Sequence, residues 1–288
     1  MRTVRLAHSP DSDDAFMFYA LAEGRVDTGA LRYVHELQDI ETLNQRAMRG
    51  ELEVTAVSIH AYAYLSDRYA LLPHGASMGD RYGPRLVSRA PPAPPTPPTP
   101  PTPMQRAYVR GRRVAVPGLL TSAYLALRLY EPEFEPVVTP FDQIEDAVIA
   151  GDVDLGLLIH EGQLTYAERG LHLVADMGEW WHGETGLPLP LGGNVVRKDL
   201  GKELIEDISR HLHASIAYGL QHRGEALDHS MQYARGLDRA KADEFVGMYV
   251  NAWTLDYGDK GREAVRRFLE RGVAGGIITR PVQVEFAG

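Results

Sequence analysis

The chain has 288 residues, of which 44% are hydrophobic and 24% charged, so about two domains with a sizeable buried core are expected. The formal net charge of -9 argues against nucleic acid or an anionic membrane as the main ligand, but it leaves room for a small anion held by local amides. The absence of cysteine excludes disulfides, cysteine-ligated zinc, iron–sulfur clusters and a thiol nucleophile.

The amino-terminal residues do not resemble a targeting segment. They lack the apolar core of a signal peptide and reach an acidic residue by Asp11. No apolar run approaches the roughly 18 residues needed to span a membrane. We therefore expect a soluble, cytoplasmic protein with no membrane partner.

The chain begins with a strand, a polar turn and a helix. Residues 3–8 alternate as a strand does, residues 9–14 read S-P-D-S-D-D, and residues 15–21 favour a helix. Serine and aspartate suit the positive end of a helix, so we expect most of these side chains to act as caps. The alternative is that the turn lines a ligand site at the start of the helix.

A second and a third strand follow at residues 30–37 and 53–57, with a helix from Asp39 to Gly50 between them. Ser58 lies where the third strand turns into a helix, as Ser9 does after the first, and two such turns on one sheet edge form a binding geometry. Residues 70–73 and 85–88 predict further strands. The glycine-rich loop between them, residues 75–84, contains no phosphate-binding motif.

Composition changes sharply over residues 90–103, which consist of proline, threonine and alanine. Proline excludes both a helix interior and a central strand, so we expect an extended, exposed insert with little apolar surface to bury. An α/β pattern stands on each side of it. The insert therefore marks a boundary between two structural units.

The second unit opens with a strand at residues 112–117 and a helix that starts at Thr121 and Ser122. These hydroxyls serve either as an N-cap or, with the free N–H groups of the helix start, as a cradle for an anion. Further strands are expected at residues 136–139 and 171–175, with a helix over residues 141–148.

Residues 153–162 read V-D-L-G-L-L-I-H-E-G, a short apolar strand that ends in a titratable pair. His160 is thus delivered at the carboxyl end of a buried strand, where ligands bind in open α/β sheets, and it is a candidate general base. The alternative is a structural histidine. Glu161 is left out of the catalytic set because neighbouring side chains on a strand point to opposite faces.

Residues 178–186 predict a tryptophan-bearing turn, and residues 187–194 an extended crossing whose two prolines demand an edge or linker position. From Lys202 onward the pattern is helical. We therefore predict an α/β protein of two lobes around a central cleft, each lobe a mixed sheet flanked by helices. The predicted division is 1–89 for the first lobe, 90–106 for the insert, 107–193 for the second lobe and 194–288 for a helical return to the first. No metal constellation, nucleophile elbow or cofactor fingerprint occurs.

Six segments, in the same order, resemble the 1,4-dihydroxy-6-naphthoate synthase family of the futalosine route to menaquinone. They are residues 9–21 (SPDSDDAFMFYAL), 39–44 (DIETLN), 114–118 (VAVPG), 121–124 (TSAY), 159–161 (IHE) and 185–192 (TGLPLPLG). The resemblance covers nearly the whole chain apart from the insert. It implies a type II periplasmic-binding-protein fold, a carboxylate substrate, no cofactor and no metal.

The family converts cyclic dehypoxanthinyl futalosine into 1,4-dihydroxy-6-naphthoate and releases dihydroxyacetone. The resemblance makes His160 the base. It assigns substrate binding to two short segments: Ala56, Val57 and Ser58, and Thr121, Ser122 and Ala123. The first turn departs from the family pattern S-P-C-P-N-D, because residues 11–13 read D-S-D here. The sequence leaves open a monomer or a homodimer.

Two alternatives stay open. Chorismate dehydratase shares the fold and the pathway, and a non-catalytic solute receptor shares the fold. The lack of a signal peptide or a lipoprotein cysteine counts against the receptor.

Overall fold

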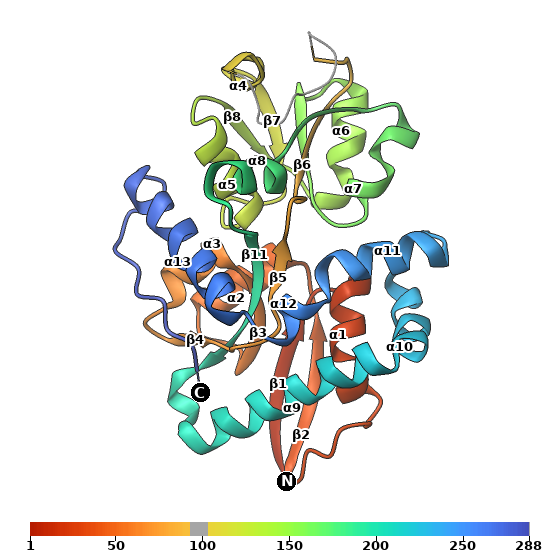
Figure 1. Cartoon of the computed structure of the whole chain (residues 1–288), viewed down its shortest axis with the longest axis vertical. Coiled ribbons are helices and arrows are strands. Elements are labelled where there is room, and N and C mark those ends of the chain that lie inside the picture. The colour runs from red at the N-terminus through yellow and green to blue at the C-terminus, as the bar shows by residue number, and fades with distance from the viewer. Residues whose placement is uncertain (93–102, 288) are drawn as a thin grey trace.

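The computed structural model describes residues 1–92 and 103–287 and has two lobes, each built on its own mixed β-sheet (Figure 1). Most of the predicted proline-rich insert lies outside the described residues. The segment predicted to be extended, residues 90–103, ends where helix α4 (Pro103–Val109) begins, so residues 103–106 of the predicted insert are helical. Proline suits the first position of a helix, where an N–H has no partner in any case.

The sheet of the first lobe has the strand order β2-β1-β3-β11-β4, and β5 pairs with β11. Strands β1, β2 and β3 run parallel, while β11 runs antiparallel to its neighbours. Its strands are β1 (Arg2–His8), β2 (Leu31–Leu37), β3 (Val54–Ser58), β4 (Tyr69–Leu71), β5 (Ser77–Gly79) and β11 (Leu189–Arg197). Strand β5 lies within the predicted glycine-rich loop.

The sheet of the second lobe has the order β10-β6-β9-β7-β8. Its strands are β6 (Arg85–Ser88), β7 (Arg113–Val116), β8 (Glu135–Val138), β9 (Leu155–Leu158) and β10 (His172–Asp176). Strand β6 was predicted within the first lobe, yet it pairs with β9 and β10. The chain therefore crosses into the second lobe between β5 and β6, ahead of the proline-rich segment.

Helices flank both sheets. Those of the first lobe are α1 (Ser12–Ala22), α2 (Ile40–Met48), α3 (Ile59–Leu65), α9 (Lys202–Gln221), α10 (Arg223–Ser230), α11 (Arg239–Tyr249) and α12 (Ala252–Leu255). Those of the second lobe are α4, α5 (Ser122–Tyr130), α6 (Ile144–Ala150), α7 (Gly162–Thr165) and α8 (Met177–Thr185), and α13 (Gly258–Ala274) follows α12. Short 3₁₀ turns are η1 (Phe141–Gln143), η2 (Tyr166–Arg169), η3 (Lys198–Leu200) and η4 (Met231–Tyr233).

The tryptophan-bearing segment, residues 178–186, was predicted to be a turn, but most of it belongs to helix α8, so this prediction is wrong. Asp176 caps it by accepting hydrogen bonds from the Gly178 and Glu179 N–H groups at 2.9 and 3.1 Å. Gly186 ends it with a left-handed φ of 70°. Gly178 must be glycine, because a Cβ there would lie 1.8 Å from the carbonyl oxygen of Tyr82.

The proline-bearing crossing is strand β11, a central strand rather than an edge or linker. Its pairing with β3 begins only at Gly192, while Pro190 faces β5 alone at an irregularity in the ladder. Pro190 therefore sits where the strand has a partner on one side, and the missing proline N–H removes no bond to β3.

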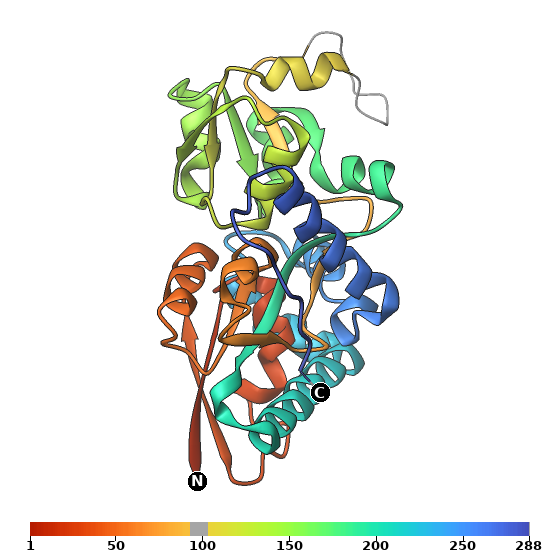
Figure 2. The ribbon, with the colours of Figure 1, turned by 90° about the vertical axis from the view of Figure 1, so that its left-hand side faces the viewer.

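The C-terminal helix α13 contacts elements of both lobes, α3 and β11 in the first and α5 in the second. Figure 2 shows it, in blue, along the junction of the lobes. Phe268 of α13 packs edge-on against Trp181 of α8, with ring centroids 5.2 Å apart. The predicted helical return thus ties the lobes together instead of serving the first lobe alone. Every helix of the described part of the chain is too short or too polar to cross a membrane.

Candidate active site

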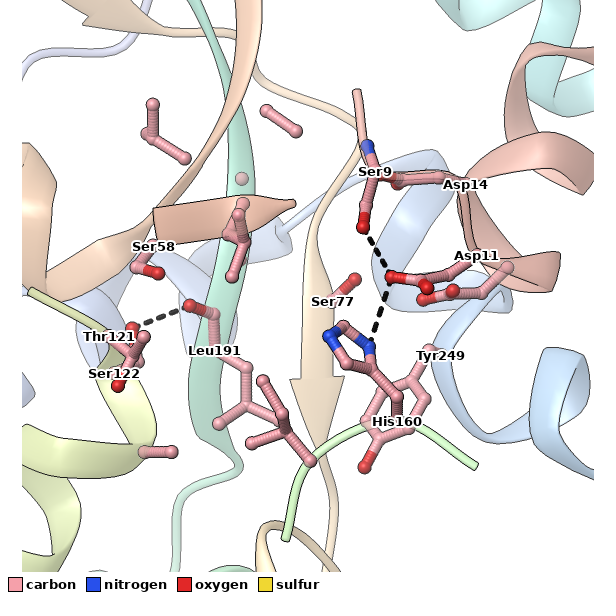
Figure 3. Close-up of a pocket in the computed structure, with 18 of the residues that line it drawn as sticks. Ser9, Asp11, Asp14, Ser58, Ser77, Thr121, Ser122, His160, Leu191 and Tyr249 are labelled. Atoms are coloured by element: carbon pink, nitrogen blue, oxygen red, sulfur yellow. Dashed lines mark hydrogen bonds and ion pairs between the residues drawn. The ribbon is translucent and has the colours of Figure 1, made fainter. Parts of the chain in front are cut away.

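A pocket with a cavity of about 120 Å³ lies between the lobes. All seven residues singled out from the sequence line it: Ala56, Val57, Ser58, Thr121, Ser122, Ala123 and His160. Strand ends and helix starts from both lobes place them there, so the predicted juxtaposition is confirmed while their roles in binding and catalysis stay predictions. Figure 3 shows two groups of polar side chains on opposite sides.

One group, here called the hydroxyl end, consists of Ser58, Thr121, Ser122 and Ala123. Ser58 ends β3 and is 4% exposed. Asn44 of α2 holds it in two ways, since its Nδ2 donates to the Ser58 Oγ at 3.1 Å and its Oδ1 accepts from the Ser58 N–H at 2.9 Å. The Ser58 hydroxyl hydrogen is left to donate to a ligand.

Thr121 caps α5 by accepting from the Tyr124 N–H at 3.2 Å, which confirms the N-cap prediction. The Ser122 Oγ donates to the Leu191 carbonyl at 2.5 Å and accepts from the His60 N–H at 3.2 Å. Its hydrogen is therefore engaged. The anion cradle considered for this turn would rest on the first N–H groups of α5, which lack intrahelical acceptors.

The other group, here called the carboxylate end, consists of Asp11, Asp13, Asp14 and His160. His160 follows β9 by two residues, with a left-handed φ of 62°, and its side chain is 15% exposed. Its Nδ1 lies 3.1 Å from the Asp11 Oδ2. Its Nε2 is buried and has no hydrogen-bond partner among the described residues. In Figure 3 this nitrogen lies on the side of the ring that points away from Asp11.

Asp11 is 1% exposed and has three polar neighbours in addition to the backbone. The Ser9 hydroxyl donates a hydrogen bond to its Oδ2, and the Arg235 Nη2 lies 2.7 Å from its Oδ1. Asp11 is the N-cap residue of α1, yet within the described structure its side chain makes no capping hydrogen bond. The capping role expected for this turn is wrong for Asp11, whose carboxylate is turned to His160.

Two further carboxyls line the carboxylate end and resist ionisation. Burial raises the pKa of Asp14 to about 7, although the Ser9 N–H donates to its Oδ2 at 2.7 Å. Burial, with the charges of Asp14 and Asp11, raises the pKa of Asp13 well above its usual range. Neutral carboxyls of this kind can donate a hydrogen bond.

The sequence reasoning missed several neighbours of the site. Asn44 could have been found from its place in the DIETLN motif, and Asp11 from the turn that departs from the family pattern. Arg235, between η4 and α11, and Phe141, at the start of η1, carry no local signal, because only the fold brings them to Asp11 and His160. Among the described residues, no group of three His, Asp or Glu side chains could hold a metal ion.

Comparisons with known proteins cover nearly the whole chain. Residues 4–274 match the family model described as Menaquinone biosynthesis. A 1,4-dihydroxy-6-naphthoate synthase of Thermus thermophilus is 41% identical over 277 residues, 96% of each chain. The enzyme of that name from Streptomyces coelicolor is 39% identical over 282 residues, 96% of this chain and 95% of the relative.

Solved structures agree on the fold. A crystal structure of an Archaeoglobus fulgidus protein has a TM-score of 0.88 and 45% identity, covering 96% of this chain and 98% of that one. The periplasmic aliphatic sulphonate binding protein of Escherichia coli has a TM-score of 0.63 at 12% identity, covering 98% and 90%. The latter likeness concerns the fold alone and confirms the predicted periplasmic-binding-protein-like architecture.

Proposed function

The chain belongs to the menaquinone biosynthesis family, and we propose that it is a 1,4-dihydroxy-6-naphthoate synthase with His160 as its general base. It would convert cyclic dehypoxanthinyl futalosine into 1,4-dihydroxy-6-naphthoate and dihydroxyacetone, which makes it a carbon–carbon lyase. The observation that carries the proposal is the position of His160: it lines a pocket opposite a set of hydrogen-bond donors, and its buried Nε2 has no hydrogen-bond partner among the described residues.

The hydroxyl end suits the substrate carboxylate. The first N–H groups of α5 and the free Ser58 hydroxyl hydrogen can donate to it, and the helix start adds a favourable partial charge. The carboxylate end is less suitable for the substrate carboxylate, because it already contains the buried carboxylate of Asp11, and Arg235 is already paired with Asp11. Binding therefore places the reacting part of the substrate, rather than its carboxylate, against His160.

A neutral imidazole at Nε2 can take up the substrate proton whose loss allows the carbon–carbon bond to break. A positioned base of this kind contributes about 10²–10⁴-fold to the rate. The three-carbon fragment leaves as dihydroxyacetone, and formation of the aromatic naphthalene ring supplies driving force, so no electron-sink cofactor is needed. Closure of the two lobes around the bound substrate would keep bulk water from the reacting atoms.

The deciding experiment is an assay of the purified protein with cyclic dehypoxanthinyl futalosine, beside His160→Ala. We expect naphthoate formation by the wild type and a loss of about 10²–10⁴-fold in kcat for His160→Ala, whose cooperative unfolding transition would show that the variant is folded. Wild-type turnover by His160→Ala would refute the base assignment.

The same assay separates the alternatives. Turnover of chorismate in place of the futalosine derivative would make the protein a dehydratase. Tight binding of a ligand that is recovered chemically unchanged would make it a receptor.

A further inference from the structure

Asp11 and His160 come from different lobes. Asp11 stands in the turn between β1 and α1 of the first lobe, whereas His160 follows β9 of the second. Their side chains meet across the pocket at 3.1 Å (Figure 3). We propose that Asp11 is the positioning residue of His160, a role that rests on the proposed function of His160 as the base.

The contact determines which imidazole nitrogen carries the proton. A carboxylate only accepts hydrogen bonds, so an Asp11 facing Nδ1 requires the hydrogen of the neutral ring to be there. Nε2 then keeps its lone pair, and no described residue occupies it. The nitrogen that faces away from Asp11 is therefore the one able to accept a substrate proton, and Asp11 stabilises the imidazolium that forms.

Asp11 is itself held firmly, as a positioning residue must be. Ser9 donates to one oxygen and Arg235 lies at 2.7 Å from the other. The Arg235 guanidinium also lies over the Phe141 ring at 4.3 Å from its centroid, and that ring packs edge-on against His160 with centroids 4.7 Å apart. Two residues of each lobe thus form a closed circuit of contacts.

The backbone supports the same conclusion. His160 and Arg235 have φ values of 62° and 48°, in the left-handed region that residues with a Cβ avoid. Such conformations are unfavourable and persist where the surroundings over-determine them, often at functional sites. Both strained residues contact the carboxylate of Asp11. Because the circuit spans the pocket, His160 is oriented only while the lobes are together.

The first test observes the tautomer directly, without turnover. In protein labelled with ¹⁵N in its histidine rings, the His160 signals are assigned by their loss in His160→Gln. We expect the ligand-free wild type to carry the proton on Nδ1. Asp11→Ala should shift a large fraction to the Nε2–H form, and Asp11→Glu should restore part of the Nδ1–H population. An unchanged tautomer in Asp11→Ala would overturn the proposal.

The second test separates orientation from binding. Asp11→Ala should lower kcat by about 10²-fold or more while KM stays within about threefold, because the substrate carboxylate is held at the hydroxyl end. A wild-type kcat in folded Asp11→Ala would refute the positioning role. If the tautomer shifts in Asp11→Ala but the wild type does not turn over the futalosine substrate, the positioning role stands and the proposed function fails.

Arg235→Gln provides a variant that keeps Asp11. We expect a loss of about tenfold in kcat, because Asp11 retains Ser9 but loses its cation. The matched control is Arg239→Gln, four positions later, whose guanidinium pairs with the exposed Asp228. Equal kcat values in the two arginine variants would contradict the part assigned to Arg235.

Discussion

At the hydroxyl end of the pocket, neutral groups hold one another: Asn44 holds Ser58, and Ser122 joins the His60 N–H to the Leu191 carbonyl. At the carboxylate end, Asp11 is held by an arginine and a serine, and it faces a histidine on the other lobe. The first end leaves N–H and O–H donors for a ligand. The second leaves an unoccupied nitrogen lone pair.

This difference separates binding from reactivity. Neutral hydrogen bonds formed by caps and strand ends fix donors in place at little electrostatic cost, which suits an end that recognises a carboxylate. A buried carboxylate beside an arginine and a histidine is costly to assemble and is favoured only if every member is paired. We therefore expect substitutions at the hydroxyl end to change KM, and those at the carboxylate end to change kcat.

The largest effect on the free energy of unfolding should come from pH. A histidine at one end and an aspartate at the other have pKa values shifted in opposite directions, so their contributions to stability change oppositely with pH. Burial lowers the pKa of His60, at the hydroxyl end, to about 4, and burial raises the pKa of Asp14, at the carboxylate end, to about 7. Between 6.5 and about 4, unfolding takes up a proton at His60, so its contribution to stability falls as pH falls. Between 3.8 and about 7, unfolding releases a proton from Asp14, so its contribution falls as pH rises.

Two variants isolate these contributions. Relative to wild type, His60→Gln should gain stability as pH falls through its window, and Asp14→Asn should gain as pH rises through its own. Each gain approaches about 1.4 kcal/mol per pH unit. Urea unfolding across both pH windows measures the difference in unfolding free energy between each variant and the wild type. If this difference changed with pH in the same direction for both variants, the predicted contrast between the two ends would be wrong.

A smaller effect is expected from Ser122→Ala. Ser122 is 2% exposed, and its hydroxyl forms hydrogen bonds with two backbone groups at the hydroxyl end. Its loss leaves both unpaired and loosens the start of α5, at a cost of about 1–2 kcal/mol. We expect the free energy of unfolding to fall by that amount. KM should rise severalfold, because the displaced N–H groups of α5 bind the substrate carboxylate less well, and kcat should stay within about threefold by steady-state kinetics.

Ser230→Ala is the matched control. This serine is also buried, and its hydroxyl donates a hydrogen bond of 2.9 Å to the Leu227 carbonyl, but neither residue lines the pocket. It should lower stability without changing KM. A larger loss in kcat than in KM for Ser122→Ala would move the hydroxyl end into the catalytic set.

The smallest effect should follow from replacing residues 93–102 with a Gly/Ser linker of equal length. Proline, threonine and alanine offer little apolar surface, and the flanking elements β6 and α4 carry none of the pocket-lining residues. We expect the free energy of unfolding to change by less than about 0.5 kcal/mol, with kcat and KM unchanged. A clear change in either kinetic constant would show that this segment acts on one of the two ends.

The hydroxyl end was the easier one to predict. Ser58 and Thr121 each stand where a strand or turn passes into a helix, and those positions are recognisable from local pattern alone. His160 was found in the same way, at the end of an apolar strand. The role of Asp11 was predicted wrongly because an aspartate that caps a helix and one that pairs with a histidine cannot be distinguished in the sequence. Asp11 and His160 are also far apart in the chain, and only the arrangement of the two lobes brings them together.

The predictions for two elements of the fold, α8 and β11, were wrong for similar reasons. Asp176 lies just before the tryptophan segment and caps it as a helix, but one capping residue before glycines is a weak signal. The two prolines of residues 187–194 suggested an edge position, and only the register shows that Pro190, the one within β11, lacks a partner on one side. Contacts between residues far apart in the sequence determine both the central position of β11 in its sheet and the pairing of Asp11 with His160.

The course of β11 also bears on how the chain folds. The second sheet uses strands from one continuous stretch, β6 to β10, whereas the first sheet needs β11 between β3 and β4. Until that strand is synthesised, β3 and β4 present unpaired edges, the kind of surface that promotes misassociation. The second lobe can therefore complete its sheet first, and the first lobe must wait for its central strand, a non-local pairing that makes it the slower of the two to form.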